Sequence, residues 1–394
     1  MSKSPFFSWF TGALCCLLLL TEACKERDPF SFTEAEIIQE MKDNKNYDKL
    51  LAYGQSVGVN TDKQNNVFGY LEELAYGHKP AHVRHFEEIK KADTTAIKIA
   101  GVRLARGEEI ERVMTDLEPR FPAYQQLKKH HTRLAESGKA DSARLVAQAL
   151  NVYRWINRQA RGAERLALVN VRGAYLVGMD STGKEVIRMN VIVGKSGSPT
   201  PGLDTYATNV VTYPYWNVPK SIAIGEMLPR IQENVYYLER NGIEVLDKNG
   251  EIVDEHTIDW SALSEEEFPY RFRQETGEDN SLGVMKVNIE NPYAIYLHDT
   301  NVRTLFDEKE RWRSHGCIRL EQPAQLANFL AGEKILKETF VEDAVATPEV
   351  DRKPSTLPFK KKVPIFIYHL PADVNQAGQL IYFDDVYGLD KGAI

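Results

Sequence analysis

The sequence is poor in cysteine, has no excess of basic residues, and contains a long apolar run only near its start. Three of the four cysteines lie within the first 24 residues, which leaves Cys317 without a disulfide partner in the rest of the chain. The formal net charge of -7 provides no basic footprint and argues against a nucleic-acid partner. Beyond residue 24, no stretch approaches the roughly 20 apolar residues of a membrane-spanning helix. These absences favour a globular protein that carries one isolated thiol.

The first 24 residues combine a positively charged start with a short apolar core. Lys3 precedes the apolar run, and Thr21-Glu22-Ala23-Cys24 follows it. This order is typical of an export signal, and a cysteine after a small residue resembles the lipidated cysteine of bacterial lipoproteins. The alternatives are a plain secretory signal and an N-terminal membrane anchor. We therefore expect an exported protein at the periplasmic face of a bacterial membrane, with residues 1–23 as the signal and Cys24 as the lipid-anchored residue.

Residues 24–160 have the periodicity of helices. Thr33–Glu36 predicts a capped helix start, and Asp141–Ala160 carries one apolar stripe at helical spacing. Further helices are expected at Ala81–Lys91, Glu108–Leu117 and Tyr124–Ser137. The histidines at positions 78, 82, 85, 130 and 131 suggest a metal site, but no cysteine or clear acidic partner completes one. We expect a helical N-terminal scaffold domain and no metal.

Near Arg165 the periodicity changes from helix to strand. Strands are expected at residues 166–171, 174–179, 186–193, 284–287, 293–297, 363–368 and 379–383. A helical and acidic stretch at about 220–275 interrupts them, either as a cap over the active site or as a surface excursion. We expect an α+β fold, with a mainly β catalytic domain over 165–345 and an inserted helical cap. The tail at 346–394 is expected to be a Pro/Lys linker (Pro354–Lys362) and strands that complete the sheet.

Cys317 lies in the polar loop Ser314-His315-Gly316-Cys317. A free cysteine is either a small hydrophobe that fills the core or a nucleophile whose surroundings lower the thiol pKa. A helix is expected directly after the loop, at Gln322–Leu330, and its N-terminus would favour a thiolate. Gly316 lets the backbone turn, so that nearby amides could converge on an oxyanion. The surroundings therefore favour a nucleophile.

Two histidines are candidates for the general base. His298 ends the strand expected at Tyr293–Asp299, where alternation places it on the face opposite Leu297. This position suits a base that is held on a rigid element. His315 is only two residues from Cys317, so we expect it to orient the loop instead.

These residues resemble the catalytic signature of the L,D-transpeptidases, the family with the YkuD-like domain. The resemblance rests on Ser314–Leu320 with His298 upstream and extends over about residues 155–390. Three further segments resemble the large, capped subgroup of that family: Pro214–Ala223, Gln274–Gly283 and Val386–Asp390. Two features depart from the pattern. Asp299-Thr300 follows His298 where compact members have Gly or Ser, and no peptidoglycan-binding repeat is evident in the N-terminal half.

The resemblance implies an L,D-transpeptidase-like β-sandwich and specific residue roles. The residue matching Cys317 is the nucleophile, and the one matching His298 is the base, oriented by a backbone carbonyl near Asp299. The residues matching His315 and Gly316 shape the oxyanion site and the loop. Candidate substrate-binding residues are Arg319, Ser314, Tyr296 and Trp216. For Arg319 a structural ion pair is equally open, and for the two aromatic residues core packing is the alternative.

The resemblance also implies acyl transfer between peptidoglycan stem peptides without a cofactor. Cys317 would attack a tetrapeptide donor and release D-Ala, and the amine of a diamino-acid acceptor would resolve the thioester into a 3→3 crosslink. Carbapenems are the implied covalent inhibitors. With water as acceptor the enzyme would be an L,D-carboxypeptidase, and with a protein amine it would attach proteins to peptidoglycan. The remaining alternatives are a non-catalytic wall-binding lipoprotein and a papain-like protease, whose cysteine precedes its histidine, unlike the order here.

Overall fold

The computed structural model describes residues 28–60, 66–85, 89–347 and 352–392. These residues form two compact units. The first comprises the described residues up to 53 together with 66–72 and 93–117, and the second comprises the others. Cys24 and the predicted signal lie outside the described residues. Within the described part of the chain, no helix is both long enough and apolar enough to cross a membrane.

Helices form the first unit, as the sequence predicts for this part of the chain. Thr33 and Glu36 exchange hydrogen bonds at the start of α1, with 2.7 Å from the Thr33 N–H to the Glu36 carboxylate, which confirms the predicted cap. Helix α1 buries Ile37 and Met41 completely. The helices that begin in this region are α1 (Glu34–Asp43), α2 (Asn46–Ser56), α3 (Val67–Tyr76), α4 (Thr94–Ala105) and α5 (Ile110–Leu117).

Two further helices, α6 (Pro122–Glu136) and α7 (Ala140–Gln159), pack in the second unit together with its sheet. The indole N–H of Trp155 donates to the buried Asp204 carboxylate at 2.8 Å, and the Tyr153 hydroxyl donates to Asp373 at 3.0 Å. The sheet therefore shares a core with helices that precede the boundary expected at residue 160. The prediction of a helix at Ala81–Lys91 is wrong. Residues Val83–His85 form strand β1 there, which pairs in parallel with Gly202–Asp204 of the main sheet.

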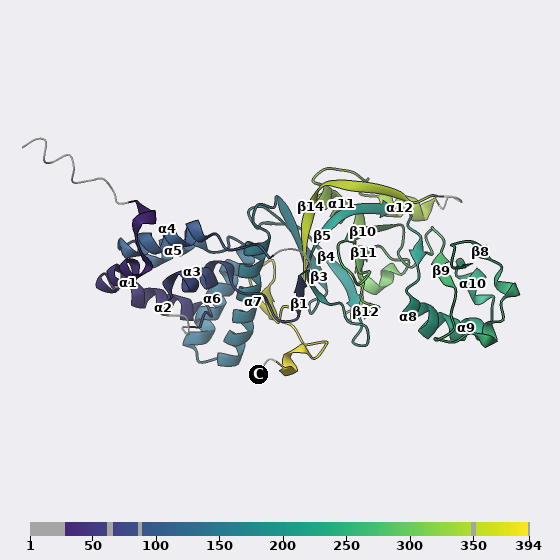
Figure 1. The fold of residues 1–394 in the computed structure, drawn as a ribbon, viewed down its shortest axis with the longest axis horizontal. Coiled ribbons are helices and arrows are strands. Elements are labelled where there is room, and N and C mark those ends of the chain that lie inside the picture. The colour runs from purple at the N-terminus through teal and green to yellow at the C-terminus, as the bar shows by residue number, and fades with distance from the viewer. Residues whose placement is uncertain (1–27, 61–65, 86–88, 348–351, 393–394) are drawn as a thin grey trace, which may run out of the picture. The chain divides into compact units, whose positions relative to one another are not determined.

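Ten strands form one sheet around the main core of the second unit (Figure 1). The order is β1-β5-β10-β11-β13-β4-β3-β2-β14, with β12 on β4, and β14 pairs with β5 as well as β2. The sheet therefore closes on itself, and the two layers of the expected sandwich are joined through β14. The predicted α+β class with a mainly β catalytic domain is confirmed. The strands are β1, β2 (Arg165–Asn170), β3 (Tyr175–Asp180), β4 (Glu185–Gly194), β5 (Gly202–Thr212), β10 (Met285–Ile289), β11 (Tyr296–His298), β12 (Trp312–Ser314), β13 (Ile318–Leu320) and β14 (Ser355–Tyr368).

The C-terminal part differs from the sequence-based expectation in two places. The expected linker at Pro354–Lys362 is largely strand, because β14 begins at Ser355 and runs along β5. A register shift between Pro358 and Val363 interrupts the ladder, which is how a strand accommodates prolines. The last predicted strand, at residues 379–383, forms β16 (Leu380–Tyr382), which pairs with β15 (Ala372–Val374) in a separate ribbon rather than in the main sheet.

The inserted cap begins at Trp216 and ends at Gln274, close to the predicted 220–275. It contains short helices, as expected, but also a four-stranded sheet of order β6-β9-β7-β8 that the sequence did not indicate. Ile231, Val245 and Phe272 are almost completely buried in a core of its own. The elements are β6 (Trp216–Asn217), α8 (Lys220–Ile222), the π-helix η3 (Ala223–Met227), α9 (Leu228–Glu233), α10 (Tyr237–Arg240), β7 (Ile243–Leu246), β8 (Ile252–Val253) and β9 (Arg271–Gln274).

Candidate active site

The turn between β12 and β13 holds Cys317 in a constrained loop. The Ser314 hydroxyl donates to the Cys317 carbonyl at 2.5 Å and accepts the Gly316 N–H at 3.1 Å. Gly316 has φ +111°, a conformation that other residues rarely adopt. The Ser314 hydroxyl is thus committed to the loop. The Gly316 N–H is also occupied, so Gly316 organises the turn and is not an oxyanion donor in this arrangement.

A second set of contacts, made by Thr200 and Tyr387, holds the same loop. The Thr200 hydroxyl donates to the Gly316 carbonyl and accepts the Gly194 N–H, each at 2.8 Å. The Tyr387 hydroxyl donates to the Gly194 carbonyl at 2.5 Å and accepts the Thr200 N–H at 3.3 Å. The C-terminal segment therefore supports the catalytic loop through Thr200.

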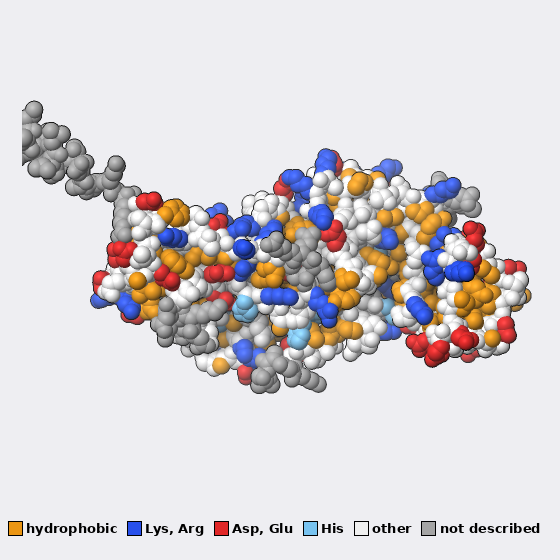
Figure 2. Space-filling view, viewed as in Figure 1, with side chains coloured by type: hydrophobic (Ala, Val, Ile, Leu, Met, Phe, Trp, Pro, Cys, Tyr) orange, Lys and Arg blue, Asp and Glu red, His pale blue; other side chains and the backbone are white. Residues whose placement is uncertain are grey.

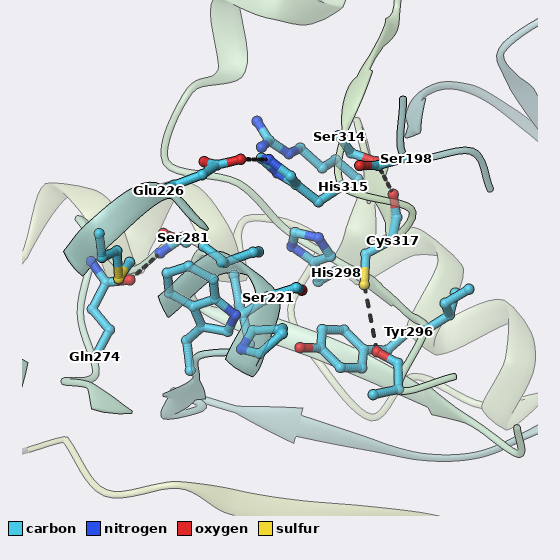
Figure 3. Close-up of a pocket in the computed structure, with 18 of the residues that line it drawn as sticks. Ser198, Ser221, Glu226, Gln274, Ser281, Tyr296, His298, Ser314, His315 and Cys317 are labelled. Atoms are coloured by element: carbon cyan, nitrogen blue, oxygen red, sulfur yellow. Dashed lines mark hydrogen bonds and ion pairs between the residues drawn. The ribbon is translucent and has the colours of Figure 1, made fainter. Parts of the chain in front are cut away.

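Strand register brings the candidate base next to the thiol. His298 on β11 pairs with Lys286 on β10 and with Arg319 on β13, so that the three residues form a row across the sheet. Cys317 comes directly before β13, beside Tyr296, which precedes His298 by two residues on β11. Figure 3 shows the imidazole of His298 beside the sulfur of Cys317. The thiol donates to the Ala294 carbonyl at 3.7 Å.

His298 is 4 % exposed, and its environment keeps the imidazole neutral. Burial lowers its pKa to about 3, and the guanidinium of Arg319 acts in the same direction, with a smaller effect from Lys286. The backbone of Asp299 and Leu282 opposes this shift by hydrogen bonding. The Nδ1 atom has no hydrogen-bond partner among the described residues. The unused nitrogen of a neutral imidazole can accept a proton, and the lowered pKa makes His298 a weak proton acceptor in this environment.

The surroundings of Cys317 favour the neutral thiol over the thiolate. Burial raises the pKa of the thiol. Hydrogen bonding to the backbone of Tyr296 and the charges of Arg319 and Lys286 lower this pKa, but their effect is smaller than that of burial. The helix expected at Gln322–Leu330 is present as α11 (Pro323–Ala331), but strand β13 lies between it and Cys317, so the N-terminus of the helix does not directly follow the thiol. The predicted stabilisation of a thiolate by that helix N-terminus is therefore wrong, and the two cations of the sheet supply the positive potential instead.

Asp299 follows His298 and shapes the loop on the other side of the base. Its completely buried carboxylate accepts the Val284 N–H at 3.0 Å and pairs with Arg303 at 2.7 Å. A Cβ at Gly283 would lie 2.3 Å from this carboxylate, and Gly283 has φ +61°, so only glycine fits. Burial raises the pKa of Asp299, and Arg303 opposes the rise. Asp299 thus holds the segment that brings Leu282 to His298.

The strand expected at Tyr293–Asp299 is shorter than predicted. Only Tyr296–His298 pairs in the sheet, because Ala294 has φ +52° and turns the chain. This turn directs the Ala294 carbonyl towards the thiol. The prediction that Tyr296 and His298 share a face is confirmed by their edge-to-face rings, whose centroids lie 5.9 Å apart.

A cavity of about 400 Å³ lies between the catalytic loop and the cap. Cys317, His298 and Arg319 line it from the sheet. Several cap residues line it from the other side, among them Trp216, Ser221, Ile222, Glu226, Arg230 and Tyr237. The insertion therefore covers the active site, as one of the two sequence-based interpretations proposed.

His315 connects the catalytic loop to the cap rather than to the thiol. Its Nε2 lies 2.7 Å from a carboxylate oxygen of Glu226 on the π-helix η3 (Figure 3). The ammonium of Lys195 lies 3.2 Å from the same imidazole nitrogen and 3.8 Å from Glu226. Single π-helical turns inside helices occur frequently at functional sites. This arrangement agrees with a role of His315 in loop orientation and leaves His298 as the candidate base.

The remaining predicted residues, Arg319, Tyr296 and Trp216, all line the cavity. Arg319 has no acidic partner among the described residues, and its Nε is unpaired, so the ion-pair alternative finds no support there. Trp216 hydrogen-bonds the Tyr296 side chain, and both half-buried rings line the cavity, while Trp216 also packs against the core of the cap. The Lys286 ammonium lies 4.9 Å from the Tyr296 ring centre.

Sequence reasoning missed Lys286, Glu226 and Arg230. Lys286 alternates with buried Met285 and Val287 in a strand, and this pattern indicates a face but not which neighbours share it. Glu226 and Arg230 lie in the cap, whose placement over the loop depends on tertiary packing. No signal in the sequence alone distinguishes them from other charged residues of the insertion.

Solved structures of L,D-transpeptidases are similar to part of the chain at low sequence identity. The structure of LdtMt1 in complex with imipenem is 15% identical, with a TM-score of 0.25, over 52% of this chain and 59% of that chain. An L,D-transpeptidase from Mycobacterium smegmatis gives the same values. The avibactam carbamoyl enzyme of Ldtfm is 10% identical, with a TM-score of 0.23, over 56% of this chain and 61% of that one.

A curated Haemophilus influenzae protein named "Putative L,D-transpeptidase" is 35% identical over 209 residues. The match covers 53% of this chain but only 41% of the relative, so the chain spans about two fifths of that protein's length. The model of the L,D-transpeptidase catalytic domain, YkuD, matches residues 164–357, which include the loop of Cys317 and His298. The chain therefore contains a region, residues 164–357, that matches the L,D-transpeptidase catalytic domain family.

Proposed function

We propose that this protein is a peptidoglycan L,D-transpeptidase that forms 3→3 crosslinks through a thioester on Cys317. The supporting observation is a cavity of about 400 Å³ that is lined by both the thiol of Cys317 and the buried imidazole of His298. A thiol is a strong nucleophile once a base takes its proton. The family match supports acyl transfer, and the choice of stem peptides as donor and acceptor is our proposal.

In the first step, the Cys317 sulfur attacks the carbonyl carbon of the diamino acid's L-centre, and His298 takes the thiol proton. The C–N bond to the terminal D-Ala breaks, His298 returns the proton to the leaving amine, and free D-Ala departs. Arg319 and Lys286 face the sulfur with positive charge, which favours the developing thiolate. The product of this step is a thioester.

In the second step, the amine of another stem attacks the thioester carbonyl and gives its proton to His298. The C–S bond breaks, and the sulfur leaves as a thiolate that takes the proton back. The new amide joins two diamino acids. Water in place of the amine would complete an L,D-carboxypeptidase reaction, and a protein amine would give a protein–peptidoglycan conjugate.

Mass spectrometry of purified muropeptides incubated with the enzyme tests this proposal. We expect the wild-type protein to release D-Ala and to form a dimer joined through two diamino acids, whereas Cys317→Ala forms neither. Release of D-Ala with a tripeptide product alone would identify a carboxypeptidase. Binding of muropeptides without any product would favour the non-catalytic, wall-binding alternative.

Carbapenem acylation provides an independent test of the same thiol. A strained lactam carbonyl that enters the cavity should react with Cys317 as the stem carbonyl does. Intact-protein mass spectra should show one added drug mass on the wild-type protein and none on Cys317→Ala. Addition to both proteins would place the reactive group elsewhere.

We further propose that the protein is exported and anchored by lipid on Cys24 at the periplasmic face of a membrane. The N-terminal residues supply the signal-like pattern for this proposal. Metabolic labelling of the full chain with a fatty acid should modify the wild-type protein and Cys15→Ala but not Cys24→Ala. Labelling of Cys24→Ala equal to that of the wild type would contradict the proposal that Cys24 carries the lipid.

A further inference from the structure

The active-site cavity is positively charged, although the chain has a net charge of -7. Its charged lining residues outside the two histidines are Glu226, Arg230 and Arg319. Glu226 is already paired with His315 and Lys195. Neither arginine has a carboxylate partner among the described residues of the chain. A concave site with unneutralised cations raises the local concentration of an anionic ligand group.

The two arginines belong to different parts of the cavity. Arg319 lies in the row of His298 on the sheet, next to the reacting thiol. Arg230 lies on α9 of the cap, four residues after Glu226 and eight after Ile222, and all three line the cavity. These three residues of consecutive short helices therefore lie on the side of the cap that faces the cavity. Arg230 therefore presents its charge on the cap side, away from the bond that reacts.

Contacts within the cap define where the Arg230 side chain lies. Its guanidinium carbon is 5.7 Å from the ring centre of Tyr237, which lines the same cavity. A cation over an aromatic face is held by the ring quadrupole without losing its hydrogen-bond donors. Figure 2 shows acidic side chains gathered on the cap surface around α9. The guanidinium thus remains available for a ligand.

We propose that Arg230 is a specificity residue that binds a carboxylate of the stem peptide other than the one that leaves with D-Ala. This inference rests on the proposed function. The leaving carboxylate is attached next to the scissile bond and therefore falls near Arg319. Two others remain: the second carboxylate of the diamino acid and the free carboxylate of the residue before it. Arginine binds carboxylates through two parallel hydrogen bonds, which discriminates against a carboxamide.

The test compares stem tetrapeptides with free carboxylates against two versions, each amidated at one of these two positions. The rate of D-Ala release is measured for the wild type, Arg230→Gln and Arg230→Lys. The matched control is Arg240→Gln, on α10 of the same cap, because Arg240 does not line the cavity. We expect Arg230→Gln to lower kcat/KM for the free-acid stem at least about 10-fold, mainly through KM, as loss of a charged hydrogen bond would. Arg230→Lys should recover part of the loss.

The pattern across the stems decides the outcome. For the wild type, one of the two amidated stems should show a kcat/KM as low as that of Arg230→Gln on the free-acid stem. The position amidated in that stem identifies the carboxylate that Arg230 binds. An equal loss on all stems would show that Arg230 only supports the cap, and equal rates of wild type and Arg230→Gln would overturn the proposal.

Binding to Cys317→Ala separates this inference from the proposed function. Calorimetric titration with the free-acid and amidated stems needs no turnover. If the wild type releases no D-Ala but Cys317→Ala binds the free-acid stem more tightly than Cys317→Ala/Arg230→Gln, the proposed reaction fails while the carboxylate site stands. If these two variants bind every stem equally, the carboxylate site fails whatever the reaction is.

Discussion

The catalytic sheet and the cap build the two walls of one cavity by different means. On the sheet, the register of β10, β11 and β13 sets Lys286, His298 and Arg319 in a row, with Cys317 beside them. The cap folds around a small core of its own, and the cluster of Glu226 with His315 and Lys195 links it to the loop of Cys317. The candidate reacting groups are thus fixed by backbone pairing, whereas the contacts of the opposite wall with the sheet include a cluster of partly exposed charges and the hydrogen bond between Trp216 and Tyr296.

This difference predicts how each wall responds to substitution. Changes in the sheet row should alter the chemical step itself, because these residues touch the reacting atoms or set their charge. Changes in the cap should alter binding and leave the chemical step nearly intact, because the cap contributes no proton acceptor to the thiol. The following predictions test this division, beginning with the largest effect.

Removal of the nucleophile should have the largest effect. We expect Cys317→Ala to lower the rate of D-Ala release by several orders of magnitude, since a covalent mechanism loses its acceptor atom. The measurement is product formation from stem tetrapeptides, with thermal unfolding as a control for the fold. Activity within tenfold of the wild type would show that the sheet row is not the reaction centre.

Removal of the base comes second. His298→Gln should lower kcat about 10²- to 10⁴-fold, the usual contribution of general base catalysis, with little change in KM. His315→Gln is the matched control, because that imidazole faces Glu226 in the cap. If His315→Gln lost more of kcat than His298→Gln, the division between the two walls would be wrong.

The thiol pKa should depend on the cations and not on His298. Arg319 and Lys286 lower the pKa of Cys317, whereas His298 is neutral near neutral pH and adds no charge. We therefore expect Arg319→Gln to shift the pH profile of iodoacetamide alkylation to higher pH and His298→Gln to leave it nearly unchanged. A large upward shift in His298→Gln would instead reveal an imidazolium–thiolate pair at rest.

Burial of the neutral base should make the fold sensitive to acid. The pKa of His298 is about 3 in the folded protein and about 6.5 in an unfolded chain, so between these values only the unfolded chain binds the proton. Stability is thus lost as the pH falls from about 6.5 towards about 3. His298→Gln should lose less stability than the wild type between pH 7 and pH 4.5, measured by urea unfolding.

An exposed histidine of the cap supplies the control for this experiment. Glu239 raises the pKa of His256, so its contribution has the opposite sign and is lost as the pH rises above that pKa. His256→Gln should therefore not reduce the sensitivity to acid. A wild-type-like acid response in His298→Gln would contradict the burial of a neutral base.

The smallest effect is expected at the link between cap and loop. The side chains of His315 and Glu226 are 35% and 42% exposed. Ion pairs with this much exposure contribute at most about 1 kcal/mol to stability. Glu226→Gln should raise KM a few-fold and hardly change kcat, with a weaker dependence on salt. Glu239→Gln, which removes a comparable pair with His256 inside the cap, is the control. A loss of kcat as large as in His298→Gln would make the cap part of the chemical centre.

Local signals in the sequence predicted the parts of the site that depend on neighbours along the chain. The Ser-His-Gly-Cys loop and the strand that ends at His298 follow from short motifs and alternation, and both are present. The capping box at Thr33 also depends only on nearby residues. These features need no knowledge of the rest of the fold.

Features that depend on distant partners were missed. The segment around Val83 became a strand because β5 offered it an edge, and Pro354–Lys362 extended into β14 for the same reason. The state of the thiol was predicted from a helix N-terminus, but it depends on Lys286 and Arg319, which strand register brings to it. Register between non-adjacent strands cannot be read from periodicity alone.

The closing strand β14 has a consequence for the order of folding. Residues 365–367 pair with β2 on one side and with β5 on the other, although more than 150 residues separate these segments along the chain. Such distant pairing forms slowly, since much chain entropy is lost before any contact forms. Because β14 is the strand that joins β2 to β5, we expect the sheet that carries β11 and β13 to close only when this late segment has paired.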